Sequence, residues 1–221
     1  MRQLIYLREF IDRGINARDR MRCGALGRFH RQGGNALLVN GLELNSNDWV
    51  LDGGGYLGRW TEEVVIRYGA RSVIVEAHPH FAANLRKRYL MNDRVEVIEG
   101  ALGGASGNIV FSTRGDSSTI IPSTVAGETV SVQLVDIKAL IGERFSSGLG
   151  CLKLNVEGAE YEVLERLISA RLAARIKSIL VQFHRNVADY EQRRSVISAR
   201  LLETHNVVFE FPFVWELWRV K

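Results

Sequence analysis

Short apolar runs alternate with longer stretches whose apolar residues recur every three or four positions. The short runs predict buried strands at Trp49–Asp52, Ser72–Glu76, Val95–Ile98, Leu152–Val156 and Ser178–Phe183. The longer stretches predict helices over 59–68, 79–91, Glu160–Ala170 and 189–204. Strands that are apolar on both faces and alternate with helices indicate an α/β domain. Its mostly parallel sheet would carry helices on both faces.

The chain closes with two further predicted strands, Val207–Phe211 and Val214–Val220, separated only by Pro212 and Phe213. A connection this short cannot carry a parallel crossover, so the two strands must form an antiparallel hairpin. Trp215 and Trp218 lie three positions apart in the last strand and are expected on opposite faces of the sheet.

Other segments have a weaker pattern. Residues 3–13 have helical spacing, 14–34 suggest a loop or irregular helix, and 36–44 suggest two short strands around the turn Asn40-Gly41. The alternation breaks at 103–148, where strands at Asn108–Ser112 and Thr129–Val135 predict a substrate-facing insertion. We therefore expect an Arg-rich helical N-terminal extension (1–34) followed by one domain (35–221).

A glycine-rich turn follows the first buried strand. Gly53, Gly55 and Gly58 match the nucleotide-binding pattern G-x-G-x-x-G, and Glu76 ends the next strand, where a carboxylate can accept hydrogen bonds from both hydroxyls of a ribose. This pattern leaves two cofactors open, a nicotinamide dinucleotide and S-adenosylmethionine. Asp52 favours the second, because its carboxylate would repel a pyrophosphate but attract a cationic amino-acid group.

The turn and the strand ends beside it supply the expected cofactor-binding residues. Ala101 and Leu102 end the third strand, where the chain would pass an adenine ring. The full expected set is Asp52, Gly53, Gly54, Gly55, Tyr56, Gly58, Glu76, Ala77, Ala101, Leu102 and Asn155.

Five segments in order resemble motifs of the FkbM family of methyltransferases. Lys153–Glu160 (KLNVEGAE) resembles the family's K-I-D-V-E-G-x-E. The others are 50–58 (D-V-G-A-N-I-G in the family), 75–79 (F-E-P), 100–111 (A-L-S…G-x-V-x-F) and 179–184 (I-x-x-E-x-H). The resemblance implies a Rossmann-like class I methyltransferase with a seven-stranded sheet. It also implies S-adenosyl-L-methionine as cofactor and O-methylation of a sugar or natural-product hydroxyl.

The sequence departs from these motifs at three positions. Tyr56 replaces an asparagine, Asn155 an aspartate and Gln182 a glutamate. Hard cations prefer carboxylate oxygens, so we expect no metal, or an acceptor that is itself anionic. His184, Glu157 and Asn155 are the candidate catalytic residues, and the ordinary pKa of histidine suits His184 to act as a base. The changes also leave open a cofactor-binding protein without catalysis, beside a NAD-dependent oxidoreductase.

Composition places few limits on function. The two cysteines have no metal-ligand spacing, and no apolar run is long enough to span a membrane, so we expect a cytoplasmic protein. Residues 1–31 hold eight arginines and three acidic residues, whereas the rest of the chain is close to neutral. We expect a small-molecule acceptor rather than nucleic acid, and the basic segment could support a homo-oligomer.

Overall fold

The computed structural model describes residues 17–112 and 129–221, so the helix expected over 3–13 lies outside the described residues. A seven-stranded sheet with the order β3-β2-β1-β7-β8-β10-β9 forms the centre of the molecule. Its strands are β1 (Trp49–Gly53), β2 (Arg71–Glu76), β3 (Val95–Glu99), β7 (Leu149–Leu154), β8 (Ile176–Val181), β9 (His205–Phe211) and β10 (Trp215–Val220). The five strands from β3 to β8 pair in parallel, which confirms the predicted α/β fold.

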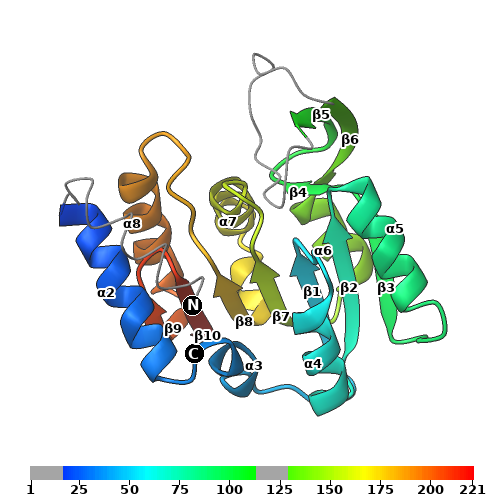
Figure 1. Cartoon of the computed structure of the whole chain (residues 1–221), viewed down its shortest axis with the longest axis horizontal. Helices are drawn as coiled ribbons and strands as arrows, with labels where there is room; N and C mark the ends of the chain where they lie inside the picture. The colour runs from blue at the N-terminus through cyan, green and yellow to red at the C-terminus, as the bar shows by residue number, and fades with distance from the viewer. Residues whose placement is uncertain (1–16, 113–128) are drawn as a thin grey trace, which may run out of the picture.

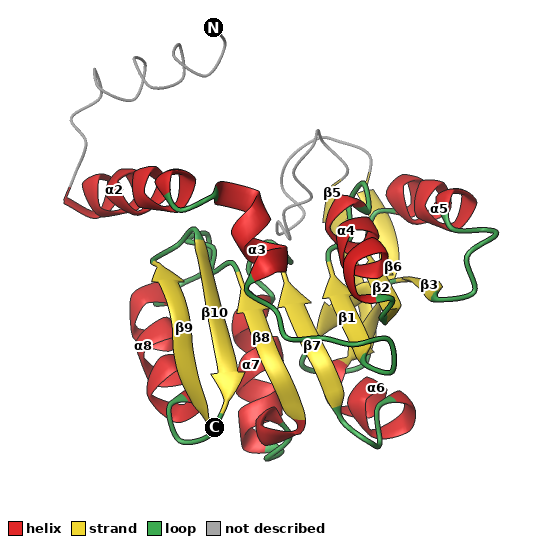
Figure 2. Cartoon of the chain, turned by 90° about the horizontal axis from the view of Figure 1, so that it is seen from below, coloured by secondary structure: helices red, strands yellow, loops and turns green. Residues whose placement is uncertain are grey.

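Helices cover both faces of this sheet (Figures 1 and 2). One face carries α2 (Ala17–Arg31), the short α3 (Leu37–Asn40), α4 (Arg59–Tyr68) and α5 (Pro79–Arg88). The other carries α6 (Ile137–Arg144), α7 (Glu160–Ser169) and α8 (Tyr190–Leu201). Single 3₁₀ turns lie at Gly34–Ala36 and Ala173–Arg175. None of the helices within the described ranges is long and apolar enough to cross a membrane.

The C-terminal hairpin has the predicted antiparallel pairing, with β10 between β8 and β9. Trp215 and Trp218 are both buried, and they belong to the cores on opposite faces of the sheet, as expected from their spacing. The hairpin therefore joins the two hydrophobic layers at this end of the molecule.

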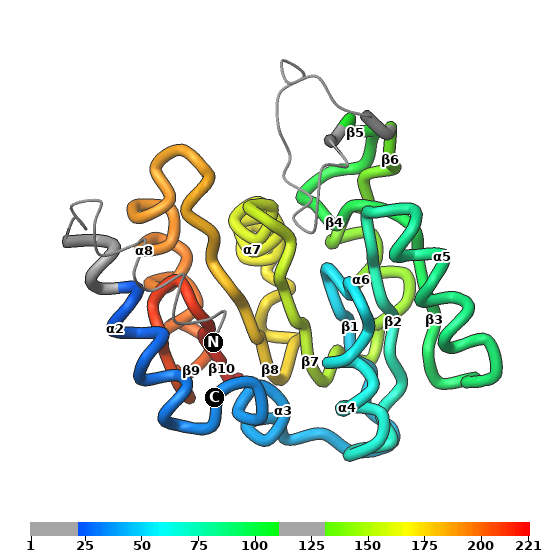
Figure 3. The backbone as a smooth tube through the Cα atoms, viewed as in Figure 1, coloured from blue at the N-terminus to red at the C-terminus, as the bar shows by residue number. Residues whose placement is uncertain are grey.

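A second, three-stranded sheet with the order β4-β6-β5 lies beside the carboxyl ends of β1 and β2 (Figure 3). It contains β4 (Ala101–Gly103), β5 (Gly107–Ser112) and β6 (Thr129–Asp136). The predicted strands of the insertion are present, but β4 was not expected because its three residues are too short to show a period. Residues 113–128 of the insertion lie outside the described residues.

The N-terminal part of the chain differs from the prediction at one place and is more regular than expected at another. Residues 17–31 form one regular helix, where the pattern had left a loop or an irregular helix open.

Residues 36–44 contain α3 rather than the expected strand hairpin. Gly41 has φ −74°, not the positive φ of the expected turn, and a Cβ there would lie 2.9 Å from Leu217 Cδ2. The glycine therefore permits close packing on β10.

Side chains of α4 hold α3 in place. Trp60 Nε1 donates to the Leu38 carbonyl at 3.2 Å, and the Tyr68 hydroxyl donates to the Val39 and Leu42 carbonyls at 2.9 Å. These tertiary hydrogen bonds use carbonyls that a strand ladder would need, which explains why local turn preference did not decide the structure here.

We expect Phe29→Ala to lower the free energy of unfolding by about 3 kcal/mol, the usual cost of emptying a buried aromatic site. Phe29 is 3% exposed on α2 and packs edge-on against Phe211 at 5.5 Å. Leu26→Ala on the same helix is the matched control, because Leu26 is 39% exposed. Urea unfolding followed by circular dichroism measures both. Equal small losses would show that α2 is not docked on the sheet.

Candidate functional site

The glycine turn lies where the sheet changes direction. From β1 the chain proceeds to β2 and β3 on one side, and the later strands β7 and β8 lie on the other side. In open parallel sheets, ligands bind at this switch point, beyond the carboxyl ends of the strands. The turn after β1 and the segment after β7, which begins at Asn155, meet at this position.

Close backbone contacts require glycine at two positions of the turn. Gly54 has φ 78°, and a Cβ there would lie 2.1 Å from the Asn155 carbonyl oxygen. A Cβ on Gly55 would lie 2.2 Å from Ile74 Cγ2. Any side chain at either position would push the turn away from β7 or β2.

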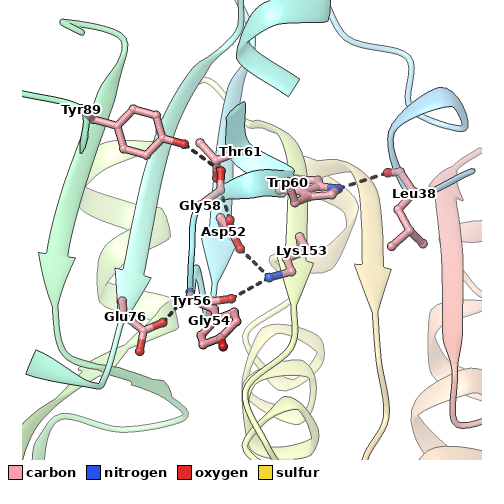
Figure 4. Close-up of polar contacts among 10 residues, drawn as sticks. All are labelled: Leu38, Asp52, Gly54, Tyr56, Gly58, Trp60, Thr61, Glu76, Tyr89 and Lys153. Atoms are coloured by element: carbon pink, nitrogen blue, oxygen red, sulfur yellow. Dashed lines mark hydrogen bonds and ion pairs between the residues drawn. The ribbon is translucent and has the colours of Figure 1, made fainter. Parts of the chain in front are cut away.

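A buried ion pair lies beneath the turn (Figure 4). Lys153 Nζ lies 2.7 Å from Asp52 Oδ1 and donates to the Gly54 carbonyl, also at 2.7 Å. The Thr61 hydroxyl donates to Asp52 Oδ2 at 2.6 Å. Asp52 is fully buried and Lys153 is 5% exposed. The pair therefore joins β1, β7 and α4 at the base of the turn.

A first cavity opens above the turn. Of the residues expected to bind the cofactor, those that line it are Gly54, Tyr56, Glu76, Ala77, Ala101, Leu102 and Asn155. Phe81 and Glu157 also line it. The cavity is not lined by four other expected residues, Asp52, Gly53, Gly55 and Gly58. These residues belong to the turn and to the end of β1 beneath it. For Asp52 this corrects the expected contact, because the residue is fully buried behind the turn, where its carboxylate binds Lys153 and Thr61.

Glu76 is fixed in the first cavity by two backbone amides. The Tyr56 N–H donates to Oε2 and the His78 N–H donates to Oε1, each at 2.8 Å. Tyr56 has φ 49°, a left-handed conformation that is uncommon for residues other than glycine, asparagine, aspartate and histidine. Each carboxylate oxygen retains a lone pair, so Glu76 can still accept hydrogen bonds from a ligand.

Asn155 presents an unsatisfied acceptor at the first cavity. Its side-chain oxygen is buried and has no hydrogen-bond partner in the structure. A buried acceptor without a partner costs about 1–3 kcal/mol. A ligand that donates a hydrogen bond here would recover that free energy, so Asn155 Oδ1 is a candidate ligand-binding atom.

A second cavity lies at the carboxyl end of β8. It is lined by Arg22, Glu157, Gln182, Phe183, His184, Arg185, Asn186 and Phe213. Glu157 therefore lines both cavities. It has φ 52° and precedes Gly158, so its carboxylate is carried by a sharp turn between β7 and α7.

His184 is held between two glutamates. Its Nδ1 lies 3.1 Å from Oε1 of the fully buried Glu160, and its Nε2 lies 3.5 Å from Oε1 of Glu157. The His184 N–H also donates to Glu160 Oε1 at 2.6 Å, and the Tyr161 hydroxyl donates to the His184 carbonyl. The imidazole ring is thus fixed in position from both sides.

The two carboxylates change the titration of His184. Burial lowers the pKa of His184, but hydrogen bonds and charge from Glu157 and Glu160 outweigh burial and raise the pKa to about 9. The hydrogen bond from His184 lowers the pKa of Glu157. His184 is therefore protonated at neutral pH and does not provide the free base expected from the ordinary histidine pKa.

Among the residues missing from the predicted set are three that hold the site in place, namely Lys153, Thr61 and Glu160. Two left a signal in the sequence. A charged side chain within a buried strand is rare unless it is paired, and Lys153 interrupts the apolar run of β7. Glu160 begins α7 within the quoted motif. Thr61 had no such signal, because only tertiary packing brings it to Asp52.

Comparison with known proteins supports the methyltransferase interpretation. The family model described as a methyltransferase FkbM domain matches residues 52–217, more than half of the chain. This match confirms the resemblance and, with it, S-adenosylmethionine rather than a nicotinamide dinucleotide as the cofactor. No curated protein matches the chain.

The solved structures similar to this chain include the following three. A candidate rRNA methylase from Clostridium thermocellum has a TM-score of 0.50 and 11% identity, covering 89% of this chain and 97% of its own. Precorrin-6y C5,15-methyltransferase from Geobacter metallireducens GS-15 has a TM-score of 0.47 and 12% identity, covering 86% and 88%. An RNA methyltransferase from Salinibacter ruber has a TM-score of 0.42 and 15% identity, covering 84% and 87%. At this identity the first match supports the fold alone.

We expect Lys153→Met to lower the free energy of unfolding by about 3–5 kcal/mol, because Asp52 is left buried without its cation. The double variant Asp52→Asn with Lys153→Met should recover most of this loss, since no buried charge remains. Lys177→Met is the control, because Lys177 pairs with Asp48 at the surface. Urea unfolding provides the values. If Lys153→Met alone is as stable as the Lys177→Met control, the buried pair does not contribute to stability.

We expect the His184 ring to titrate near pH 9, measured by NMR of its ring nitrogens. Since its folded pKa is above the ordinary value of about 6.5, the protonated ring stabilises the folded state fully below about pH 6.5. This stabilisation is lost as the pH rises through about 9. Glu157→Gln should bring the titration closer to neutral pH. A titration near 6.5 in the unaltered protein would contradict the placement of the His184 ring between the carboxylates of Glu157 and Glu160.

Proposed function

Because the chain belongs to the FkbM family of methyltransferases, we propose that it methylates a hydroxyl oxygen of a small molecule, a sugar or natural-product intermediate, held in the second cavity. One observation carries this proposal. Glu157 lines both the cavity over the glycine turn and the cavity beyond β8. A donor in the first cavity and an acceptor in the second would meet at this residue.

The residues of the first cavity fit S-adenosylmethionine. Glu76 has free lone pairs for the ribose hydroxyls, and the unpartnered Asn155 Oδ1 can accept from the ammonium group of the methionine portion. Ala101 and Leu102 offer an apolar wall for the adenine. Asp52 acts from behind the turn, through Lys153 and the Gly54 carbonyl.

The chain contributes to methyl transfer in two ways: it positions the acceptor oxygen, and it accepts the hydroxyl proton. When bound, S-adenosylmethionine supplies an electrophilic methyl group on a sulfonium. Holding the acceptor oxygen in line with that methyl accounts for much of the acceleration in such displacements. The hydroxyl proton must leave as the oxygen attacks, and the Glu157 carboxylate is the proton acceptor at the boundary of the two cavities.

His184 then becomes a positioning residue. As an imidazolium beside Glu157 it keeps that carboxylate ionised and oriented, and Glu160 fixes the ring from the other side. The proposal also holds that methyl transfer needs no divalent metal. The amides of Asn155 and Gln182 offer a hard cation weaker ligands than the aspartate and glutamate of the family motifs.

The proposal is tested first by calorimetry and then by turnover. S-adenosylhomocysteine should bind and NAD should not. Tritiated methyl should pass from S-adenosylmethionine to members of a panel of hydroxylated sugars and acids, equally with and without a chelator. Binding of S-adenosylhomocysteine with no transfer to any acceptor would favour a cofactor-binding protein without catalysis.

We expect Glu157→Gln to lower kcat about 100-fold, the usual contribution of a general base, while affinity for S-adenosylhomocysteine changes less than threefold. Glu165→Gln is the matched control, because Glu165 pairs with Arg193 away from both cavities. Steady-state kinetics and calorimetry of both variants separate a role in proton acceptance from a role in cofactor binding. A parallel loss of kcat and cofactor affinity in Glu157→Gln would assign the residue to cofactor binding instead.

A further inference from the structure

Tyr56 holds a backbone conformation that is unfavourable for its residue type. Its φ of 49° lies in the left-handed region, where the Cβ of an L-residue comes too close to the following carbonyl oxygen. Glycine avoids this cost, and a short amide side chain such as that of asparagine reduces it. The corresponding FkbM motif, D-V-G-A-N-I-G, has an asparagine at this position. The chain therefore carries a large aromatic residue where a smaller residue would be less strained.

The backbone contact of Tyr56 does not explain the aromatic ring. The Tyr56 N–H donates to Glu76 Oε2 at 2.8 Å, and every residue except proline offers that donor. The side chain is thus not needed to hold Glu76. Figure 4 shows the Tyr56 side chain extending away from the buried ion pair of Lys153 and Asp52, so the ring has no part in that pair either.

Burial within the chain offsets the strain at Tyr56 much less than at a comparable residue. Phe213 also has a left-handed backbone, with φ 59°, but it is only 9% exposed and its ring centre lies 5.4 Å from that of Tyr190. Burial of an aromatic ring is strongly stabilising. Tyr56 is 41% exposed, so a large part of its ring has no such compensation.

The Tyr56 ring belongs to the wall of the first cavity. Its centre lies 4.7 Å from that of Phe81, and the two rings are inclined at 74°. This edge-to-face geometry is a favourable one for aromatic pairs and fixes the orientation of the Tyr56 ring. Both residues line the first cavity together with Glu76. The aromatic pair and the carboxylate are therefore presented to the same ligand.

We propose that the Tyr56 ring, supported by Phe81, contacts the nucleoside half of the bound cofactor and holds its ribose against Glu76. This inference rests on the proposed function, because it takes the first cavity as the cofactor site. The hydrogen bond between the Tyr56 N–H and Glu76 keeps the ring beside that carboxylate. Contact with the cofactor then compensates for the strained backbone, which packing within the chain does only in part.

Replacement of Tyr56 by the residue of the family motif tests the inference. Tyr56→Asn should weaken binding of S-adenosylhomocysteine about tenfold, a loss within the range known for removal of an aromatic side chain that stacks on a base. The melting temperature should stay level or rise, because relief of the left-handed strain offsets the lost contact with Phe81. Calorimetry measures the affinity, and circular dichroism measures the melting temperature.

Two further variants separate the ring from its surroundings. Tyr56→Phe keeps the ring and should bind S-adenosylhomocysteine within about threefold of the unaltered chain, since the stacking surface remains. Leu57→Ala is the matched control and should change neither measurement. Leu57 is the next residue of the turn and is 38% exposed, but it is not one of the described residues that line the first cavity.

A fragment of the cofactor shows which half the ring contacts. 5′-Methylthioadenosine contains the nucleoside and the sulfur but lacks the amino-acid portion. Tyr56→Asn should weaken its binding by the same factor as the binding of S-adenosylhomocysteine. If the fragment binds equally well to the variant and to the unaltered chain, the ring does not contact the nucleoside, and the inference is wrong.

Two other results would overturn the inference while the proposed function stands. One is unchanged affinity for S-adenosylhomocysteine in Tyr56→Asn. The other is a fall in its melting temperature of more than about 4 °C, which would assign the ring to the stability of the fold. Failure of the unaltered chain to bind S-adenosylhomocysteine would instead count against the proposed function itself.

Discussion

The buried Lys153–Asp52 pair is the interaction on which the rest of the site depends. It joins the two strands between which the sheet reverses direction, and its ammonium group also holds the carbonyl of Gly54. Two charges removed from water are stable only when each is fully paired. The pair therefore requires one arrangement of β1, β7 and the glycine turn that follows β1, and the first cavity takes its shape from that arrangement.

A second constraint acts beyond β7, where the chain turns sharply into α7. Glu157 occupies a left-handed conformation there, and Glu160 one turn later binds the backbone of both Gly158 and His184. A single buried carboxylate thus fixes the segments after β7 and β8 relative to each other. Because Glu157 belongs to the first of these segments and lines both cavities, the boundary between the cavities has a defined position without any contact from a ligand.

The periodicity of the sequence was sufficient to predict the sheet, most helices and the C-terminal hairpin. It failed at 36–44, where the preference of Asn40-Gly41 for a turn was overridden by hydrogen bonds from Trp60 and Tyr68. The expected binding residues mostly meet in one cavity, since parallel strands end at the same edge. The partners of Asp52 and His184 were not predictable, because pairs such as Lys153 and Asp52, a hundred residues apart, depend on strand order rather than local pattern.

The position of α2 has a consequence for how such a protein can diverge. The family match begins at residue 52, yet Arg22 of α2 lines the second cavity. Under the proposed function, the choice of acceptor and the transfer chemistry reside partly in separate stretches of sequence. Exchange of the leading helix between relatives could change the molecule that is methylated while the turn, the buried ion pair and Glu157 remain as they are. Selectivity would then evolve by recombination at the amino-terminal end rather than by stepwise substitution in the catalytic body.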